Sequence, residues 1–250
     1  MQKKIIYLLF FSIILFACNN KTGKETIQRK TFIVLFDVSI SIDEQIMDGF
    51  IQNFKTVMSA AEEGDVLIAG LISDKSLSEN KLPINFTFPI YEKKTDNPMY
   101  EAADKEKFDQ LVQKNRDSVY YCVEHLLNSK ELTAYTDIFG GLQLAQKIYS
   151  NYPDNSKVLV IMSDMKESDK VYDFEKAIPD ENKTVKILED LTAKRQMPEL
   201  TGVRVYVSGA NTNDTDSFNK LQHFWVEYFK AAKADFTADR FCATLIKFDE

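Results

Sequence analysis

The chain has 250 residues, of which 44% are hydrophobic and 28% are charged, and its formal net charge is −7 at pH 7. This composition is typical of a globular protein with a full hydrophobic core. The acidic balance and the lack of a basic stripe argue against a nucleic-acid partner.

Residues 1–17 predict a signal peptide that is not part of the fold. Two lysines precede the apolar run "IIYLLFFSIILFA" at residues 5–17, which is too short for a typical membrane-spanning helix. The run ends in "LFAC", which resembles the bacterial lipobox, whose cysteine is acylated and becomes the mature N-terminus. The resemblance implies that Cys18 carries lipid and tethers the protein to a membrane. The alternatives are a secretory signal cleaved one residue earlier and an uncleaved anchor.

The next segment, residues 18–30, is polar and has no apolar periodicity, so it predicts a flexible tether. The folded domain is then expected at residues 31–250. Asn19 and Asn20 follow Cys18 and provide no aspartate retention signal of the kind described for some bacteria. The expected location is therefore the cell envelope, at the outer membrane and facing the periplasm.

Six apolar runs predict the strands of one sheet. Several of them consist almost entirely of Val, Ile and Leu, which is typical of strands that are buried on both faces. The runs lie at residues 32–37, 66–72, 84–88, 157–163, 203–208 and 242–248.

Helical patterns lie between these strands. In the first, Ile46, Phe50 and Phe54 recur at steps of four, as on one face of a helix. The alternation of strands and helices predicts an α/β fold, a doubly wound and mostly parallel six-stranded sheet with helices on both faces. The expected helices lie at residues 42–61, 102–128, 138–149, 181–195 and 217–232.

Beyond Cys18, two cysteines remain, Cys122 in a helical pattern and Cys242 in a strand pattern. Both are expected as buried thiols, and a disulfide between them is the alternative.

Oxygen-bearing side chains cluster where predicted strands end. In "FIVLFDVSISID", residues 32–43, Asp37, Ser39 and Ser41 follow the first strand, and Asp164 follows the strand "KVLVIMS". Thr136 precedes the helix expected at 138–149. Ligands of open α/β sheets bind at the carboxyl ends of strands, where the strand order reverses. Two carboxylates with several hydroxyls predict a hard cation there: Mg²⁺, with Mn²⁺ or Ca²⁺ as alternatives.

These residues resemble the metal-ion-dependent adhesion site of the von Willebrand factor type A domain. "DVSIS" matches the family's Asp-x-Ser-x-Ser motif, "TDIFGGL" matches its threonine element with Thr136, and Asp164 matches the aspartate that ends its fourth strand. Met165 departs from the glycine that usually follows this aspartate, which puts the shape of the last loop in question.

The resemblance implies a role for each residue. Ser39 and Ser41 would coordinate the ion, Thr136 would do so directly or through water, and Asp37 and Asp164 would hold coordinated waters. The remaining position would accept an acidic group. The implied function is a non-enzymatic protein-binding module whose partner is an envelope protein that offers a carboxylate.

Three alternatives remain open at this point. Ser39 or Ser41 could cap the helix at 42–61, and the aspartates could bind amides at helix starts. The chain could instead be a Mg²⁺-dependent phosphoester hydrolase, because haloacid-dehalogenase-like enzymes also place an aspartate after the first strand; Ser39 stands where their second aspartate would be. A metal-free scaffold lipoprotein is the third.

The loop at residues 165–183 is expected to carry partner specificity, because it leaves the strand that ends at Asp164 and is longer than most connections. Its apolar residues Val171, Tyr172 and Phe174 would either contact the partner or pack the loop onto the domain.

Overall fold

The computed structural model describes residues 28–79, 82–129, 133–212, 214–244 and 248. The predicted signal peptide, Cys18 and all but the last three residues of the predicted tether lie outside this part of the chain.

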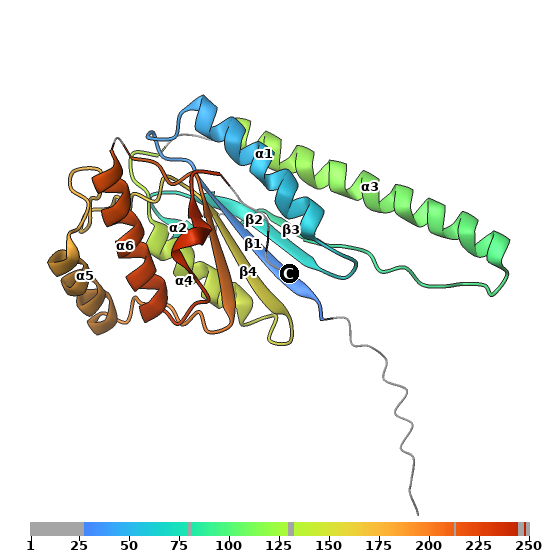
Figure 1. Ribbon diagram of the computed structural model, residues 1–250. Helices are drawn as coiled ribbons and strands as arrows, with labels where there is room; N and C mark the ends of the chain where they lie inside the picture. The colour runs from blue at the N-terminus through green and yellow to red at the C-terminus, as the bar shows by residue number, and fades with distance from the viewer. Residues whose placement is uncertain (1–27, 80–81, 130–132, 213, 245–247, 249–250) are drawn as a thin grey trace, which may run out of the picture.

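Helices and strands mostly alternate along the described chain, with one pair of consecutive helices before the fourth strand (Figure 1). Their order is β1 Lys30–Asp37, α1 Glu44–Ala60, β2 Val66–Ile72, α2 Ser76–Glu79, β3 Ile84–Thr87, α3 Pro98–Asn128, α4 Ile138–Tyr149, β4 Ser156–Met162, α5 Glu181–Ala193, β5 Val203–Ser208, α6 Thr215–Ala231, the 3₁₀ turn η1 Ala238–Arg240 and β6 Phe241–Cys242.

The strands form one six-stranded sheet in the order β3-β2-β1-β4-β5-β6. All neighbouring pairs are parallel except β2 and β3, which are antiparallel. The predicted α/β fold is therefore confirmed. The chain runs outward in opposite directions from β1 and β4, so the strand order reverses between these two central strands. Their register pairs Phe36 with Met162, so the next residues, Asp37 at the end of β1 and Ser163 just after β4, lie side by side.

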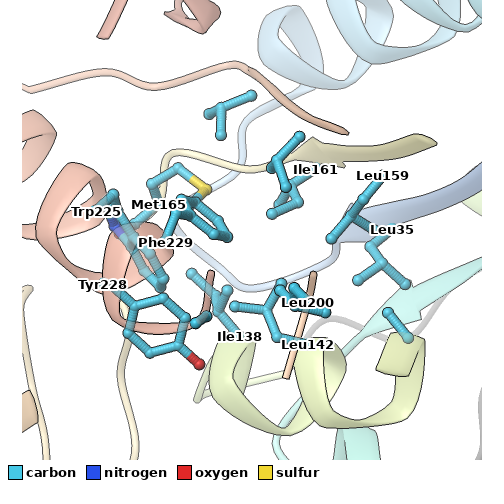
Figure 2. Packing of buried hydrophobic residues seen from close by; sticks show 14 of the residues in the cluster. Leu35, Ile138, Leu142, Leu159, Ile161, Met165, Leu200, Trp225, Tyr228 and Phe229 are labelled. Carbon is cyan, nitrogen blue, oxygen red and sulfur yellow. The ribbon is translucent and has the colours of Figure 1, made fainter. Parts of the chain in front are cut away.

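Helices cover both faces of the sheet (Figure 1). Alternate residues of β1 enter different cores because successive side chains of a strand point to opposite faces. Phe32, Val34 and Phe36 pack with residues of α1 and α3. Ile33 and Leu35 pack with residues of α4, α5 and α6, and aromatic side chains of α6 fill much of this second core (Figure 2).

The predicted strand at 242–248 is wrong in extent. β6 has two residues, and residues 245–247 lie outside the described part. The run contains Ala243 and Thr244, which form a bend, so its apolar pattern does not become an edge strand of normal length.

The helix expected at 102–128 begins four residues earlier, at Pro98. The side chain of Asn97 accepts a hydrogen bond from the N–H of Met99, and proline is favoured in the first helical turn because it lacks an N–H group. The short helix α2 was not expected from the sequence. The Ser76 hydroxyl stabilises its start by donating to the carbonyl of Ser73.

The expectation of two buried thiols is wrong for Cys122, which is exposed on α3, whereas Cys242 is half-buried. The helix turns its valines, Val119 and Val123, to the core, and this rotation leaves Cys122 outside. Both thiols are free in the described chain. Among the described residues, the structure has no helix long and apolar enough to cross a bilayer.

Candidate metal centre

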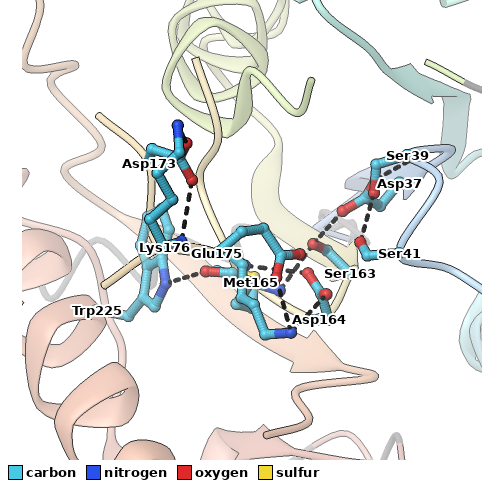
Figure 3. Close-up of polar contacts among 11 residues, drawn as sticks. Asp37, Ser39, Ser41, Ser163, Asp164, Met165, Asp173, Glu175, Lys176 and Trp225 are labelled. Atoms are coloured by element: carbon cyan, nitrogen blue, oxygen red, sulfur yellow. Dashed lines mark hydrogen bonds and ion pairs between the residues drawn. The ribbon is translucent and has the colours of Figure 1, made fainter. Parts of the chain in front are cut away.

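The turn between β1 and α1 brings two hydroxyls together. Asp37 is fully buried; its Oδ1 accepts a hydrogen bond from the Ser39 N–H at 2.8 Å, and its Oδ2 accepts one from the Ser163 hydroxyl at 2.6 Å. Ser39 Oγ and Ser41 Oγ lie 2.9 Å apart (Figure 3). The carboxylate thus fixes the backbone of the turn, and the two serine oxygens converge on one point.

The capping explanation for the serines is excluded by the structure. Asp43 caps α1, because its side chain accepts a hydrogen bond from the N–H of Ile46 at 2.8 Å. The amides bound by Asp37 and Asp164 belong to Ser39 and Lys166, which lie in loops and not at helix starts. The hydroxyls and carboxylates of the motif therefore need another explanation.

The segment that ends at Thr136 lies beside this turn. Thr133 donates its N–H to the carbonyl of Val38, and its own carbonyl accepts from Ile40, both at 3.1 Å. Thr136 and Ser168 exchange backbone hydrogen bonds at 2.8 and 3.0 Å. Thr136 is nearly fully buried. Backbone pairing therefore joins all three motif segments, although they are far apart in the sequence.

Asp137 has the role expected of a residue in the first turn of a helix. Its side chain caps α4 by accepting a hydrogen bond from the N–H of Gly140 at 2.7 Å. Asp137 is therefore used as a helix cap, and Thr136 is the residue of this segment that the family resemblance assigns to the candidate site.

Asp164 follows β4 and is also buried. Its Oδ1 accepts from the Lys166 N–H at 3.1 Å, and its Oδ2 lies 3.5 Å from the Lys166 ammonium. Burial, followed by the negative charge of Asp37, raises the pKa of Asp164 to about 6. Burial and the charge of Asp37 thus both disfavour a negative charge on Asp164, and a divalent cation would relieve this cost.

Met165, the residue that departs from the family pattern, adopts the left-handed conformation in which glycine is favoured, with φ of 65°. Its backbone is held on both sides: its N–H donates to Ser163 Oγ at 2.8 Å, and its carbonyl accepts from the indole of Trp225 at 2.8 Å. These bonds and the burial of its side chain explain how a methionine keeps the turn that a glycine would make.

Three residues of the site were not predicted from the sequence: Ser163, Lys166 and Glu167. Ser163 donates its hydroxyl to Asp37 and accepts a hydrogen bond from the N–H of Met165, so it links the two. In the sequence, the only sign of this role was a hydroxyl-bearing residue directly before Asp164. Glu167 is fully buried, and its Oε2 accepts the N–H groups of Ile138 and Phe139. Burial raises the pKa of Glu167 well above its usual value. No pattern in the sequence marked this glutamate as the group that fixes the loop to α4.

The loop after Asp164 is packed onto the domain through both of its aromatic residues, Phe174 and Tyr172. Phe174 is 3% exposed and lies 4.8 Å from Phe224 between ring centroids. Tyr172 is half-buried against Phe139, and its hydroxyl bonds to Asp190. Val171 is 65% exposed. Phe174 therefore belongs to the core, and a partner contact at this loop would fall to Val171 and its charged neighbours.

The hydroxyl geometry fits a magnesium-type ion. Two neighbouring ligands of an octahedral ion at about 2.1 Å lie roughly 3 Å apart, which matches the 2.9 Å between Ser39 Oγ and Ser41 Oγ. Among the described residues, no group of three or more His, Cys, Asp and Glu side chains could hold a metal. A candidate site in this part of the chain therefore depends on hydroxyl ligands, which leave the charge of a bound ion largely uncompensated.

The sequence matches no protein-family model, and no curated protein is significantly similar to it. Several solved structures are similar overall. Proximal thread matrix protein 1 from the mussel byssus is 16% identical, with a TM-score of 0.37 over 82% of this chain and 48% of that one. A von Willebrand factor type A structure from Catenulispora acidiphila is 11% identical, with a TM-score of 0.38 over 82% and 43%. The manganese-loaded TRAP protein of Plasmodium vivax is 13% identical, with a TM-score of 0.39 over 78% and 62%. The chain spans less than two thirds of each of these proteins.

Proposed function

We propose that the protein is a von Willebrand factor type A module that binds a protein partner through a Mg²⁺-type ion and has no enzymatic activity. Lipidated Cys18 would tether it to the cell envelope, at the outer membrane and facing the periplasm. The observation that carries the proposal is the convergence of Ser39 Oγ and Ser41 Oγ, 2.9 Å apart, on a turn fixed by buried Asp37. Both lie where the strand order reverses, which is where such sheets bind ligands.

Each residue would act as the family resemblance implies. Ser39 and Ser41 would coordinate the ion, Thr136 would do so directly or through water, and Asp37 and Asp164 would orient its waters. Mg²⁺ is the expected ion, with Mn²⁺ or Ca²⁺ as alternatives. The bound ion supplies an electrophilic position for a partner carboxylate, because two uncharged hydroxyl ligands do not neutralise it.

The hydrolase alternative would need Asp37 as a free nucleophile. Both of its carboxylate oxygens accept hydrogen bonds, from Ser39 and Ser163, and its side chain is fully buried. This arrangement suits a residue that holds a turn in place, and it opposes attack on a phosphoester. A metal titration separates the metal-free scaffold, the other alternative, from the proposed module.

The function is tested with the full chain in detergent and a fluorescent peptide that carries a single aspartate. We expect binding of the peptide in Mg²⁺, loss of binding in excess EDTA, and no binding of the peptide with Asn at the same position. Peptide binding that is equal in EDTA would contradict the role of the ion. Turnover of a generic phosphoester that is lost in Asp37→Asn would support the hydrolase.

Mg²⁺ affinity is expected to depend on pH through Asp164. Its raised pKa, about 6, means that the carboxyl is protonated below this pH and must lose its proton to serve the ion. The apparent Mg²⁺ dissociation constant should rise about tenfold per pH unit below pH 6. Titrations at pH 7.5, 6 and 5 measure this dependence.

The metal-free protein should show the opposite trend in stability. Because the pKa of Asp164 is raised on folding, the contribution of Asp164 to the free energy of unfolding falls as the pH rises from about 4 to about 6. Asp164→Asn is the control, with weak Mg²⁺ binding that no longer changes over this range. A wild-type affinity that is constant between pH 7.5 and 5 would contradict the assignment.

A further inference from the structure

Lys166 occupies a position that the metal site does not require. Its ammonium lies 3.5 Å from Asp164 Oδ2 and 3.2 Å from Glu175 Oε2. Its own N–H donates to the other carboxylate oxygen of Asp164. One residue thus engages both oxygens of a carboxylate that is proposed to serve the ion.

This ion pair differs from the other lysine pairs of the loop in its burial. The Lys166 side chain is 19% exposed and that of Asp164 is 4% exposed. Lys176, in contrast, is 84% exposed and pairs with Asp173 at 2.6 Å. Exposed pairs contribute little because water screens them, whereas a shielded pair holds its charges more strongly.

The backbone holds Lys166 in this place. Met165 is in a left-handed turn, and the Trp225 indole binds its carbonyl, so the chain is directed past Asp164 toward Glu175. In Figure 3, Asp164 lies on the side of Ser163 that faces Glu175, while Asp37, Ser39 and Ser41 lie on the other side. The Asp164 carboxylate is therefore paired with the lysine at the edge of the proposed site.

We infer that Lys166 is an internal cation that competes with the divalent ion for Asp164 and so sets the metal affinity of the site. This inference rests on the proposed function. Metal binding would be an exchange in which the ammonium leaves Asp164 and keeps its contact with Glu175 as the ion enters. Without an ion, the same ammonium would balance the charge of Asp164.

The test measures Mg²⁺ affinity and metal-free stability in full-chain variants. Trp225 is the only tryptophan of the chain, and its indole donates a hydrogen bond to the carbonyl of Met165, between Asp164 and Lys166. Its fluorescence is therefore a suitable reporter of metal binding. Lys166→Gln should bind Mg²⁺ about tenfold more tightly than wild type, because repulsion between two cations is removed. It should also lower the melting temperature of the metal-free protein by about 2–6 °C.

Two variants make the test specific. Lys166→Arg keeps the charge and should remain close to wild type in both measurements, whereas Lys176→Gln removes an exposed lysine of the same loop and should change neither. If Lys166→Gln is poorly folded, Lys166→Met keeps the aliphatic stem and should also bind Mg²⁺ more tightly. Unchanged or weaker Mg²⁺ binding in both Lys166→Gln and Lys166→Met would overturn the inference while leaving the proposed function intact. If wild type, Lys166→Gln and Lys166→Met all bind no Mg²⁺, both the proposed function and the inference are wrong.

Discussion

Replacing Ser39 and Ser41 together by alanine is expected to weaken Mg²⁺ binding by roughly a hundredfold or more, because two of the three proposed hydroxyl ligands to the ion are removed. The metal-free fold should tolerate this change. The two hydroxyls form a hydrogen bond with each other, so removing both of them leaves no unpaired hydroxyl behind. We expect the free energy of unfolding without metal to change by less than about 1 kcal/mol. Trp225 fluorescence and urea unfolding measure the two quantities.

A matched double variant, Ser59→Ala with Ser118→Ala, controls for the loss of two hydroxyls. Each of these serines is exposed on a helix and donates to the carbonyl four residues earlier, at 2.9 Å. This variant should keep the wild-type Mg²⁺ affinity. If the double alanine at 39 and 41 also keeps it, the serines are not ligands.

Replacing Phe174 by alanine is expected to destabilise the protein by about 3–5 kcal/mol, the usual cost of removing a buried phenylalanine. Phe174 is 3% exposed and packs against Phe139 and Phe224, so the change leaves a cavity in the core beneath the loop. Such a loss is a large share of the stability of an ordinary domain. Chemical unfolding of the metal-free protein measures it.

Val171 provides the control in the same loop. Because Val171 is 65% exposed, Val171→Ala should change the free energy of unfolding by less than about 0.5 kcal/mol. A small effect at Phe174 would mean that the loop detaches easily, and that its aromatic side chain is available to a partner after all.

The sheet could be predicted from the sequence because its central strands are apolar without interruption. The bounds of β2 and β5 match the prediction, and those of β1 and β4 differ by one or two residues. The last strand could not be predicted in the same way. An apolar run at the edge of a sheet forms a strand only where a neighbour pairs with it, and β6 pairs with β5 over two residues.

In the candidate site too, the residues of a local motif could be predicted, whereas those that depend on tertiary contacts could not. Asp37, Ser39 and Ser41 were predicted because the motif is local, and its place at the end of a central strand follows from the fold. Glu167 and Lys166 depend on tertiary contacts. Glu167 reaches the first turn of α4, and Lys166 reaches back to Asp164 and forward to Glu175. Their roles depend on the path of an irregular loop, which no periodicity in the sequence determines.

The central claim is that one divalent ion binds between the β1–α1 turn and the segments of Thr136 and Asp164. Anomalous diffraction from crystals of the protein grown with Mn²⁺ tests it most directly, because Mn²⁺ replaces Mg²⁺ and its position is seen independently of the protein model. We expect a single strong peak about 2 Å from Ser39 Oγ and Ser41 Oγ, with Thr136, Asp37 and Asp164 around it. An empty turn, or a peak bound by other residues while this turn stays empty, would contradict it.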